Sequence, residues 1–329
     1  MGVRNDGYKI AILGATSQIA RDMSITFANL GMHHLHLFAR RTDEVRKWLA
    51  ANGLLDRYAV GDFSEFSGQE FDAVINFVGV GNPAQAAKMG ASILDVTYEF
   101  DSLALNYVQN FPSCRYIFLS SGAAYGGTFS TPANENTTSS FSINKLLPTD
   151  WYGAAKMFAE CRHRALPELP IVDLRVFNYF SKSSDINARF LITDILRSIR
   201  DRHVFQTSNE NIVRDYIGPN EFMQVIQKIL MAPPQNVAVD CFTQAPVDKV
   251  SMLEHMRHDF GLRYVLVKQR TGLLATGSKV NYYSKNRKAT DLFGYFPDAS
   301  SLQVVLEESR CLLNKISDYR QGSMLALQP

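Results

Sequence analysis

The chain has 329 residues, of which 46% are hydrophobic and 20% are charged, values close to the averages of soluble globular proteins. Its 34 Lys and Arg residues almost balance 32 Asp and Glu residues, whereas a protein that binds nucleic acid needs clustered positive charge. An aromatic content of 11% is too high for a disordered chain. We therefore expect one large or two modest folded domains, with no nucleic acid among the partners.

The distribution of apolar residues and cysteines indicates a cytoplasmic protein. No apolar run approaches the roughly 18 residues that cross a bilayer, and no signal-peptide core follows the polar residues 1–6. The four cysteines form no CxxC pair: Cys114, Cys161, Cys241 and Cys311. We expect free thiols in a reducing compartment, no membrane partner and, because no histidine stands at metal-ligand spacing from a cysteine, no metal site.

Apolar runs alternate with helical spacing in the first half of the chain. We interpret the runs as strands at 8–13, 34–39, 57–60, 73–78 and 115–120. Helical spacing appears at 19–30, from 42 to about 53 and in a long stretch at 84–108. Strand and helix that alternate at intervals of roughly 20–40 residues are typical of a right-handed parallel α/β sheet.

The second half is less regular. Residues 121–148 are rich in Ser, Thr, Asn and Gly and predict a long, functional loop. A helix at 151–165 and a strand at 171–176 follow, and then short helices at 190–199 and 221–230. We predict a sheet domain at 1–180, to which the motifs below assign a dinucleotide, and a smaller mixed α/β region at 181–329, to which they assign the substrate and which returns some segments to the core.

The first motif is Gly14-Ala15-Thr16-Ser17-Gln18-Ile19-Ala20, between the first strand and the first helix. A dinucleotide pyrophosphate meets a helix N-terminus at this position of a Rossmann-type, doubly wound parallel sheet. The usual pattern has three glycines, but Ser17 and Ala20 replace the second and the third. Alanine still permits close packing of helix on strand, and Ser17 adds a hydroxyl for phosphate. An ordinary tight turn is the alternative. The residues expected to bind the cofactor are Gly14, Thr16, Ser17, Gln18 and Ile19.

Two further motifs carry groups that can move a proton. Tyr152 and Lys156 are four residues apart, so they lie on the same face of the predicted helix. An ammonium beside a phenol lowers its pKa, which makes Tyr152 a workable general acid or base. Ser121 ends a predicted strand at the edge where ligands bind, and its hydroxyl can bond a substrate carbonyl. A helix cap or turn is the structural alternative for this serine.

Together, these motifs resemble the extended short-chain dehydrogenase/reductases that act on nucleotide-linked sugars. The segments 174–179 (Leu-Arg-Val-Phe-Asn-Tyr) and 213–218 (Val-Arg-Asp-Tyr-Ile-Gly) look like that family's entry to the substrate region and its Arg-Asp-Phe-Ile segment. Residues 291–294 with Pro297 look like its late Leu-Gly…Pro element. The resemblance covers roughly residues 8–315.

The resemblance implies a role for each matching residue. Tyr152 is the proton donor or acceptor, Lys156 is its partner and holds the nicotinamide ribose, and Ser121 orients the sugar, whereas Ser120 packs or bonds backbone. Further cofactor contacts are implied at Asp62, Phe63, Phe77, Val78, Gly79 and Phe177. Further substrate contacts are implied at Gly122, Asn178 and Arg214. The chain departs from the family pattern at 77–79, where Ala is more usual, and at Asp95, where Asn is frequent.

Arginine suits the substrate diphosphate because its planar fork binds phosphate oxygens bidentately. The alternative for Arg214 is a surface ion pair with Asp215.

The residues at the end of the second strand indicate whether the cofactor is NAD(H) or NADP(H). An acidic residue there selects NAD by accepting the ribose hydroxyls. This chain has Phe38-Ala39-Arg40-Arg41, and two cations attract a 2′-phosphate, so NADP(H) is favoured over NAD(H). A basic surface turn is the other interpretation.

The absence of certain acid and base side chains reduces the number of reactions that the resemblance allows. The family's 4,6-dehydratases place Asp-Glu after the catalytic Ser or Thr, but Gly122 and Ala123 follow Ser121 here. Its combined epimerase-reductases need a Cys and a His, and Tyr179 and Phe180 stand where the His is expected. This leaves an NADPH-dependent keto-sugar reductase, which the two arginines favour, or a 4-epimerase with bound NAD. A regulator that binds dinucleotide without catalysis is a further alternative.

The partner implied is a nucleotide-diphosphate sugar. A homodimer is usual for this family, through helices at about 84–108 and 148–165.

Overall fold

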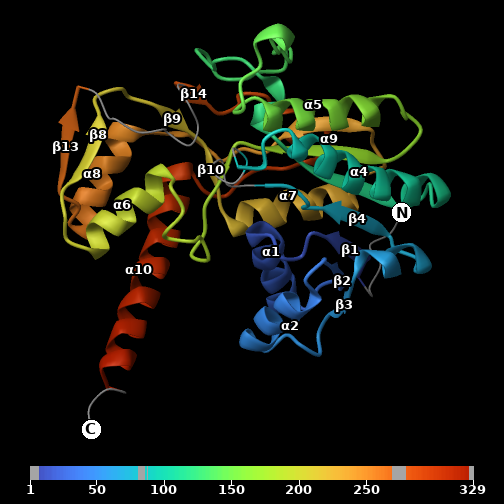
Figure 1. Ribbon diagram of the computed structural model, residues 1–329, viewed down its shortest axis with the longest axis horizontal. Helices are drawn as coiled ribbons and strands as arrows, with labels where there is room; N and C mark the ends of the chain where they lie inside the picture. The colour runs from blue at the N-terminus through green and yellow to red at the C-terminus, as the bar shows by residue number, and fades with distance from the viewer. Residues whose placement is uncertain (1–6, 81–85, 87, 269–278, 326–329) are drawn as a thin grey trace.

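A seven-stranded sheet forms the larger part of the molecule (Figure 1). The computed structural model describes residues 7–80, 86, 88–268 and 279–325, with side chains up to residue 316. All neighbouring strands are parallel, in the order β11-β6-β5-β4-β1-β2-β3. The strands are β1 (Lys9–Leu13), β2 (His34–Phe38), β3 (Ala59–Gly61), β4 (Ala73–Asn76), β5 (Arg115–Ser121), β6 (Ile171–Val176) and β11 (Val237–Asp240).

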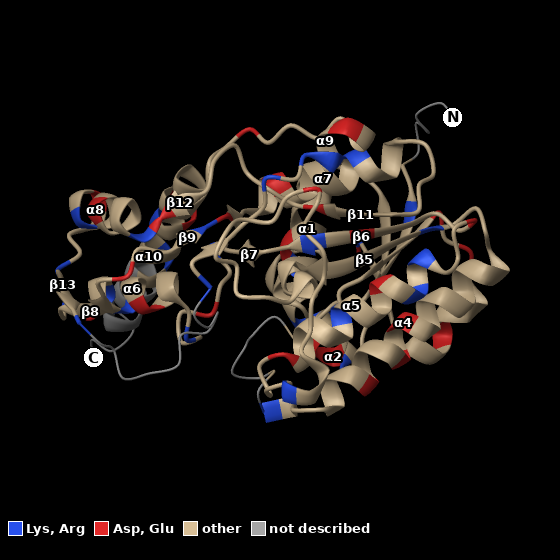
Figure 2. Cartoon of the chain, turned by 90° about the horizontal axis from the view of Figure 1, so that it is seen from above, with Lys and Arg blue, Asp and Glu red and all other residues tan. Residues whose placement is uncertain are grey.

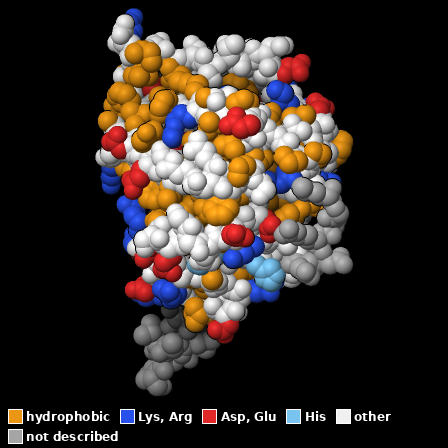
Figure 3. Space-filling view, turned by 90° about the vertical axis from the view of Figure 1, so that its right-hand side faces the viewer, with side chains coloured by type: hydrophobic (Ala, Val, Ile, Leu, Met, Phe, Trp, Pro, Cys, Tyr) orange, Lys and Arg blue, Asp and Glu red, His pale blue; other side chains and the backbone are white. Residues whose placement is uncertain are grey.

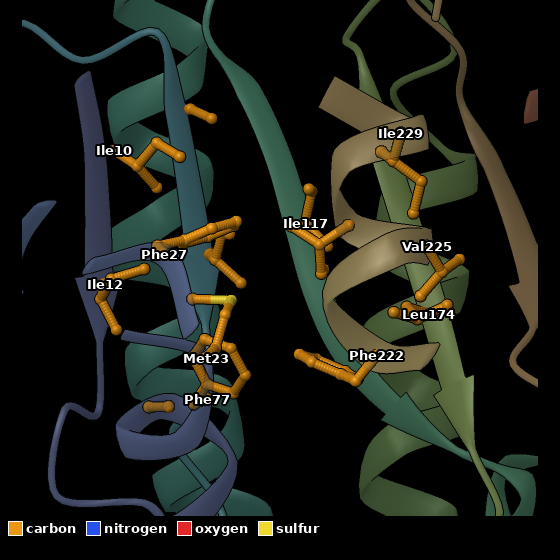
Figure 4. Close-up of a cluster of buried hydrophobic side chains, with 14 of the residues drawn as sticks. Ile10, Ile12, Met23, Phe27, Phe77, Ile117, Leu174, Phe222, Val225 and Ile229 are labelled. Carbon is orange, nitrogen blue, oxygen red and sulfur yellow. The ribbon is translucent and has the colours of Figure 1, made fainter. Parts of the chain in front are cut away.

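Helices cover both faces of this sheet because the strands are apolar on both sides. The helices are α1 (Gln18–Asn29), α2 (Thr42–Ala51), α4 (Ser92–Asn110), α5 (Trp151–Arg164), α7 (Pro219–Met231) and α9 (Lys288–Phe293). On one face, Met23 and Phe27 of α1 and Phe222 of α7 pack on the strands, as Figure 4 shows. On the other face, α4 and α5 lie side by side (Figures 1 and 2) and share a second core. The predicted Rossmann-type α/β fold is confirmed.

The smaller part of the molecule lies beside the carboxyl edge of the sheet and has its own core. Its helices are α6 (Leu191–Arg200), α8 (Lys249–Phe260) and α10 (Ser301–Leu325). Its short strands are β7 (Asn178–Tyr179), β8 (Phe205–Ser208), β9 (Val213–Arg214), β10 (Tyr216–Ile217), β12 (Val247–Asp248), β13 (Tyr264–Val267) and β14 (Asn281–Tyr282). Three 3₁₀ turns occur among the described residues of the larger part: η1 (Phe63–Gly68), η2 (Gly122–Tyr125) and η3 (Ile143–Lys145).

The structure corrects several predicted elements. The single helix expected at 84–108 is wrong, because a turn at Gly90 and Ala91 interrupts it before α4 begins. Gly90 has φ +55°, a conformation that suits glycine at a helix end. Residues 84, 85 and 87 of that stretch lie outside the described residues. The strand expected at 57–60 begins later, at Ala59. Helices α8 and α10 were not among the predicted elements.

Among the described residues, no helix combines the length and the apolar character that a membrane span requires. The same part of the chain contains no cluster of His, Cys, Asp and Glu side chains suited to a metal ion.

Candidate active site

The loop after β1 passes close to the end of β4. Gly14 has φ +83°, and an ideal Cβ on it would lie 2.9 Å from the Val78 backbone nitrogen and 3.0 Å from the Phe77 carbonyl carbon. Both the backbone conformation and the close approach therefore require glycine. The loop lies where the strand order reverses, between β1 and β4, which is the crevice in which open α/β sheets bind ligands.

The N-terminus of α1 faces this crevice. The Arg21 N–H donates to the Ser17 carbonyl, so the N–H groups of Gln18 and Ile19 precede the first helical bond and are available to an anion. The Gln18 side chain donates to the hydroxyls of Ser181 (2.9 Å) and Ser184 (2.8 Å). The Gln18 side chain thus connects α1 to the smaller part of the molecule. For a phosphate, Gln18 can therefore offer only its backbone N–H.

Two arginines follow β2 on the surface. Arg40 and Arg41 are both exposed, and the Arg41 guanidinium lies 3.2 Å from the Glu44 carboxylate one turn along α2. Since an exposed pair of this kind is worth at most about 1 kcal/mol, Arg41 can turn toward another anion at little cost.

Asp62 and Phe63 follow β3. Bonds from the Ser64 hydroxyl and N–H lower the pKa of the Asp62 carboxyl. Phe63 packs against Phe100 at 4.6 Å between ring centroids. The Asp62 carboxylate therefore already caps η1.

The end of β4 meets a buried lysine. Phe77 is buried against Phe222, and the Val78 N–H donates to the Asn76 side chain at 2.9 Å. An ideal Cβ on Gly79 would lie only 3.5 Å from Lys156 Nζ. The strand end and the lysine thus border the same space.

Close packing brings Tyr152 to Ser121. Ser121 ends β5 and accepts a bond from the Ala123 N–H at 3.2 Å. An ideal Cβ on Gly153 would lie 2.5 Å from the Ala123 carbonyl oxygen, so only glycine lets α5 approach η2 this closely. The neighbouring Tyr152 lies close enough to Ser121 for the serine side chain to lower the pKa of the phenol. Two of the three residues expected to handle the proton are thus neighbours.

Lys156 lies one turn further along α5. Its Nζ donates to the Leu119 carbonyl at 2.7 Å and is 5.9 Å from the centroid of the Tyr152 ring. Burial lowers the pKa of Lys156 to about 8, although Asp101, Asp173 and Glu160 oppose the shift. Burial raises the pKa of Tyr152, and the Ser121 side chain acts the other way. The expectation that Tyr152 has a lowered pKa is therefore wrong for the chain alone, because burial dominates.

A polar layer lies behind Lys156, between α5 and the sheet. The Ser120 hydroxyl donates to Glu160 at 2.5 Å, so Ser120 bonds a side chain rather than the backbone. Glu160 also pairs with Arg175, which reaches Asp240 on β11 at 3.6 Å. Ser120, Arg175 and Asp240 stand side by side on adjacent strands.

A second buried group continues this layer. The His163 ring bonds Asp173 at 2.6 Å and Asp101 at 2.7 Å. Burial alone would lower the pKa of His163, but the two carboxylates raise it to about 9. His163 is therefore charged at neutral pH and satisfies both acids.

Aromatic rings enclose the other side of Ser121. An ideal Cβ on Gly122 would lie 2.4 Å from the Phe177 ring, so glycine is required where the ring packs on η2. The Tyr282 ring packs against Phe177 and Phe129, and its hydroxyl lies 3.3 Å from Ser121 Oγ. The structure thus places Phe177 beside Gly122, and it adds Tyr282 to the site.

Positive charge lies behind Tyr282. Arg214 is 3% exposed, donates to the Val213 carbonyl at 2.8 Å, and has its Cζ 5.9 Å from the Tyr282 centroid. Lys279 Nζ lies 4.6 Å from the same centroid. Burial lowers the pKa of Lys279 to about 8, and Arg214 adds to the shift. The two cations would attract an anionic substrate.

The residues next to Arg214 have structural partners. The Asp215 carboxylate accepts bonds from Thr243 and Ser301. The Asn178 amide donates to the Asp215 carbonyl at 3.1 Å. Arg214 is buried, so the alternative of a surface ion pair is wrong.

Sequence reasoning missed Tyr282 and Lys279. They belong to the segment before α9, which has no motif. Tyr282 reaches Ser121 through the pairing of β14 with β9, and Lys279 lies over the Tyr282 ring. The long loop lies here too, since the Asn281 N–H donates to the Phe129 carbonyl at 2.9 Å and the Lys285 N–H to the Ala133 carbonyl at 2.7 Å. These backbone hydrogen bonds show that the long loop and the segment before α9 lie together on one side of the site.

The comparison with protein families identifies the same kind of protein as the site geometry. A model of the NAD dependent epimerase/dehydratase family matches residues 10–239, more than half of the chain. The chain belongs to this family of NAD-binding enzymes, which confirms the resemblance to the extended short-chain dehydrogenase/reductases. No curated protein sequence shows significant similarity to the chain.

Solved structures share the fold at low identity. An epimerase from Methanothermobacter thermautotrophicus has a TM-score of 0.77 at 16% identity, covering 96% of this chain and 95% of that one. A UDP-glucose 4-epimerase from Stenotrophomonas maltophila, with bound NAD and formylated UDP-arabinopyranose, has a TM-score of 0.74 at 14% identity, covering 95% and 99%. A dTDP-glucose 4,6-dehydratase from Bacillus anthracis, in complex with NAD, has a TM-score of 0.71 at 14% identity, covering 92% and 96%.

Proposed function

We propose that this protein is a nucleotide-sugar 4-epimerase that works with a nicotinamide dinucleotide. The observation that carries the proposal is that Tyr152 lies next to Ser121 and Lys156 at the sheet edge, beside the close approach of Gly14 to β4. Similar folds in solved epimerases favour this reaction over the keto-sugar reduction that the two arginines favoured in the sequence.

The loop at Gly14 fits a dinucleotide. Its bare Cα lets the backbone approach β4, and the N–H groups at the start of α1 suit the pyrophosphate. The nicotinamide would lie toward Gly79 and Lys156, and when bound it supplies the hydride acceptor and donor of the reaction. Asp62 and Phe63 are proposed to border the adenine.

The protein residues then manage one proton at one carbon. Tyr152 removes the proton of the sugar hydroxyl and returns it when the carbonyl is reduced from the other face. Ser121 holds the oxygen that changes between hydroxyl and carbonyl. Arg214 and Asn178 are proposed to hold the diphosphate while the sugar turns between the two half-reactions. No further acid or base is required, which fits Gly122 after Ser121.

The direct test uses purified protein with UDP-glucose and UDP-N-acetylglucosamine. We expect the 4-epimer to form without added cofactor, and NAD to be released when the protein is denatured. Chromatography of the sugars and of the released nucleotide provides both measurements. Absence of both epimers and of bound dinucleotide would contradict the proposal.

An NADPH-dependent reductase of a nucleotide-linked keto-sugar is the second candidate. The specific observation is that Arg40 and Arg41 are exposed after β2, where an NAD enzyme carries an acid. A 4-keto-6-deoxy nucleotide sugar with NADPH would then lose absorbance as the coenzyme is oxidised. Rapid oxidation of this kind, with no epimer formed, would favour the reductase.

A homodimer through α4 and α5 is part of the proposal. Tyr98 and Phe158 are 53% and 50% exposed, and their rings lie 6.4 Å apart on the outer surface of the two helices. Another view of the surface, in Figure 3, shows hydrophobic side chains interspersed with charged ones. We expect a dimer in sedimentation, and Phe158→Asp to dissociate it.

A further inference from the structure

The hydroxyl of Ser121 has three polar neighbours, as many as its one proton and two lone pairs can serve. A serine hydroxyl has one proton to donate and two lone pairs to accept with. The Ala123 N–H occupies one lone pair at 3.2 Å. The Tyr282 phenol lies 3.3 Å away, and the Tyr152 phenol is close enough for Ser121 to lower its pKa. The direction of each bond therefore depends on which phenol donates.

Tyr282 is arranged as a donor. It is 5% exposed, and its ring is fixed between Phe129, at 4.9 Å, and Phe177, at 5.1 Å between centroids. Burial raises the pKa of Tyr282, so the phenol keeps its proton at neutral pH. The cations of Lys279 and Arg214 near the ring draw electron density from the oxygen, which strengthens a donor and weakens an acceptor.

We propose that Tyr282 is a positioning residue that donates its phenolic proton to Ser121 and thereby directs the only proton of Ser121 toward Tyr152 and the substrate oxygen. With both lone pairs occupied, Ser121 can act only as a donor. A serine locked in this way stabilises the phenolate of Tyr152 and any negative charge on the reacting oxygen. The inference rests on the proposed role of Ser121 in the epimerase reaction.

The charged and titratable groups around Tyr152 come from several elements. Lys156 lies on α5, Ser121 on β5 and Tyr282 on β14, and the cations of Arg214 and Lys279 lie behind Tyr282. Tyr282→Phe changes only one of these groups, because it keeps the ring and its packing and removes the hydroxyl.

The kinetic test is a double-mutant cycle with UDP-glucose and UDP-N-acetylglucosamine as probes. Tyr282→Phe should lower kcat about tenfold, as one lost hydrogen bond to a functional group would, with little change in KM. In a Ser121→Ala background the same substitution should have no further effect, because its partner is gone. Tyr283→Phe, the neighbouring phenol, is the matched control and should retain the wild-type rate. Equal losses in both backgrounds would mean that Tyr282 acts only through packing.

A titration without substrate separates this inference from the proposed reaction. The absorbance of tyrosinate, taken as the difference between proteins with and without Tyr152→Phe, reports the pKa of Tyr152. Tyr282→Phe should raise that pKa by about half a unit to one unit, because Ser121 no longer donates steadily to the phenolate. An unchanged pKa would overturn the inference, even if both probes are turned over. An absence of turnover by wild type would contradict the proposed reaction alone.

If Tyr282→Phe lowers the melting temperature strongly, Lys279→Met replaces it. This variant keeps the phenol and removes one of the cations near it. We expect the pKa of Tyr152 to rise in the same direction by a smaller amount, and only when Ser121 is present. A shift of equal size in the Ser121→Ala protein would assign the effect to the charge of Lys279 itself and overturn the role of Tyr282.

Discussion

Replacing Gly14 with alanine tests whether the loop after β1 depends on close approach to β4. The backbone at φ +83° costs an alanine about 1–2 kcal/mol. The new Cβ would also lie 2.9 Å from the Val78 nitrogen, and contacts this short force a backbone shift that costs about 1–3 kcal/mol. Gly14→Ala should therefore lower the free energy of unfolding by about 2–5 kcal/mol, adding both costs.

A matched control separates the two costs. Gly31 has φ +64°, and an ideal Cβ there meets nothing within 4 Å among the described residues. Gly31→Ala should lose only about 1–2 kcal/mol from its backbone conformation. Urea unfolding of both variants measures the difference, and calorimetry with NAD measures cofactor affinity, which should fall only for Gly14→Ala. Equal stability losses in the two variants would refute the assignment of close approach at Gly14.

Four further predictions concern the site. Tyr152→Phe should lower turnover by about 10²–10⁴-fold while dinucleotide binding persists, as steady-state rates and calorimetry would measure; near-normal turnover would mean another proton donor. Arg214→Ala should weaken binding of UDP by about 2–5 kcal/mol and leave NAD binding unchanged in calorimetry; equal UDP affinity would make the arginine structural. If Arg40 and Arg41 contact a 2′-phosphate, replacing both with Ala should reduce any preference for NADPH over NADH toward unity, and tighter binding of NADH to wild type would exclude that contact. The pKa of Lys156 is lowered from 10.5 to about 8, so between these pH values the unfolded chain binds more protons than the folded chain, and the contribution of Lys156 to stability rises with pH. Lys156→Met should therefore flatten the rise of the urea midpoint with pH over this range. An unchanged slope would contradict the lowered pKa.

The sequence was sufficient for the parts of the protein whose signals are local. The strand–loop–helix unit around Gly14 and the pair Tyr152 and Lys156 lie within a few residues of each other, and the sheet brings them to one edge as expected. The break at Gly90 was missed because apolar spacing continues on both sides of it. The hydrophobic pattern reports which face is buried but not where a backbone changes direction.

Other parts of the site have no local signal. Tyr282 reaches Ser121 across 161 positions of the chain, through the pairing of β14 with β9. The raised pKa of Tyr152 depends on burial, which was not visible in the spacing of Tyr152 and Lys156. Such features require the packed structure, because they arise from neighbours that the chain order does not place together.

The polar layer behind Lys156 also fixes how α5 sits on the sheet. An apolar interface would tolerate sliding of the helix by one turn, about 5.4 Å, because one aliphatic side chain can replace another. Here such a slide would separate Glu160 from Arg175 and His163 from its two carboxylates, leaving buried charges unpaired. Removing one partner of a buried pair costs about 3–5 kcal/mol, so the misplaced helix is strongly disfavoured. The position of Tyr152 is thereby selected during folding by charges that take no part in the reaction.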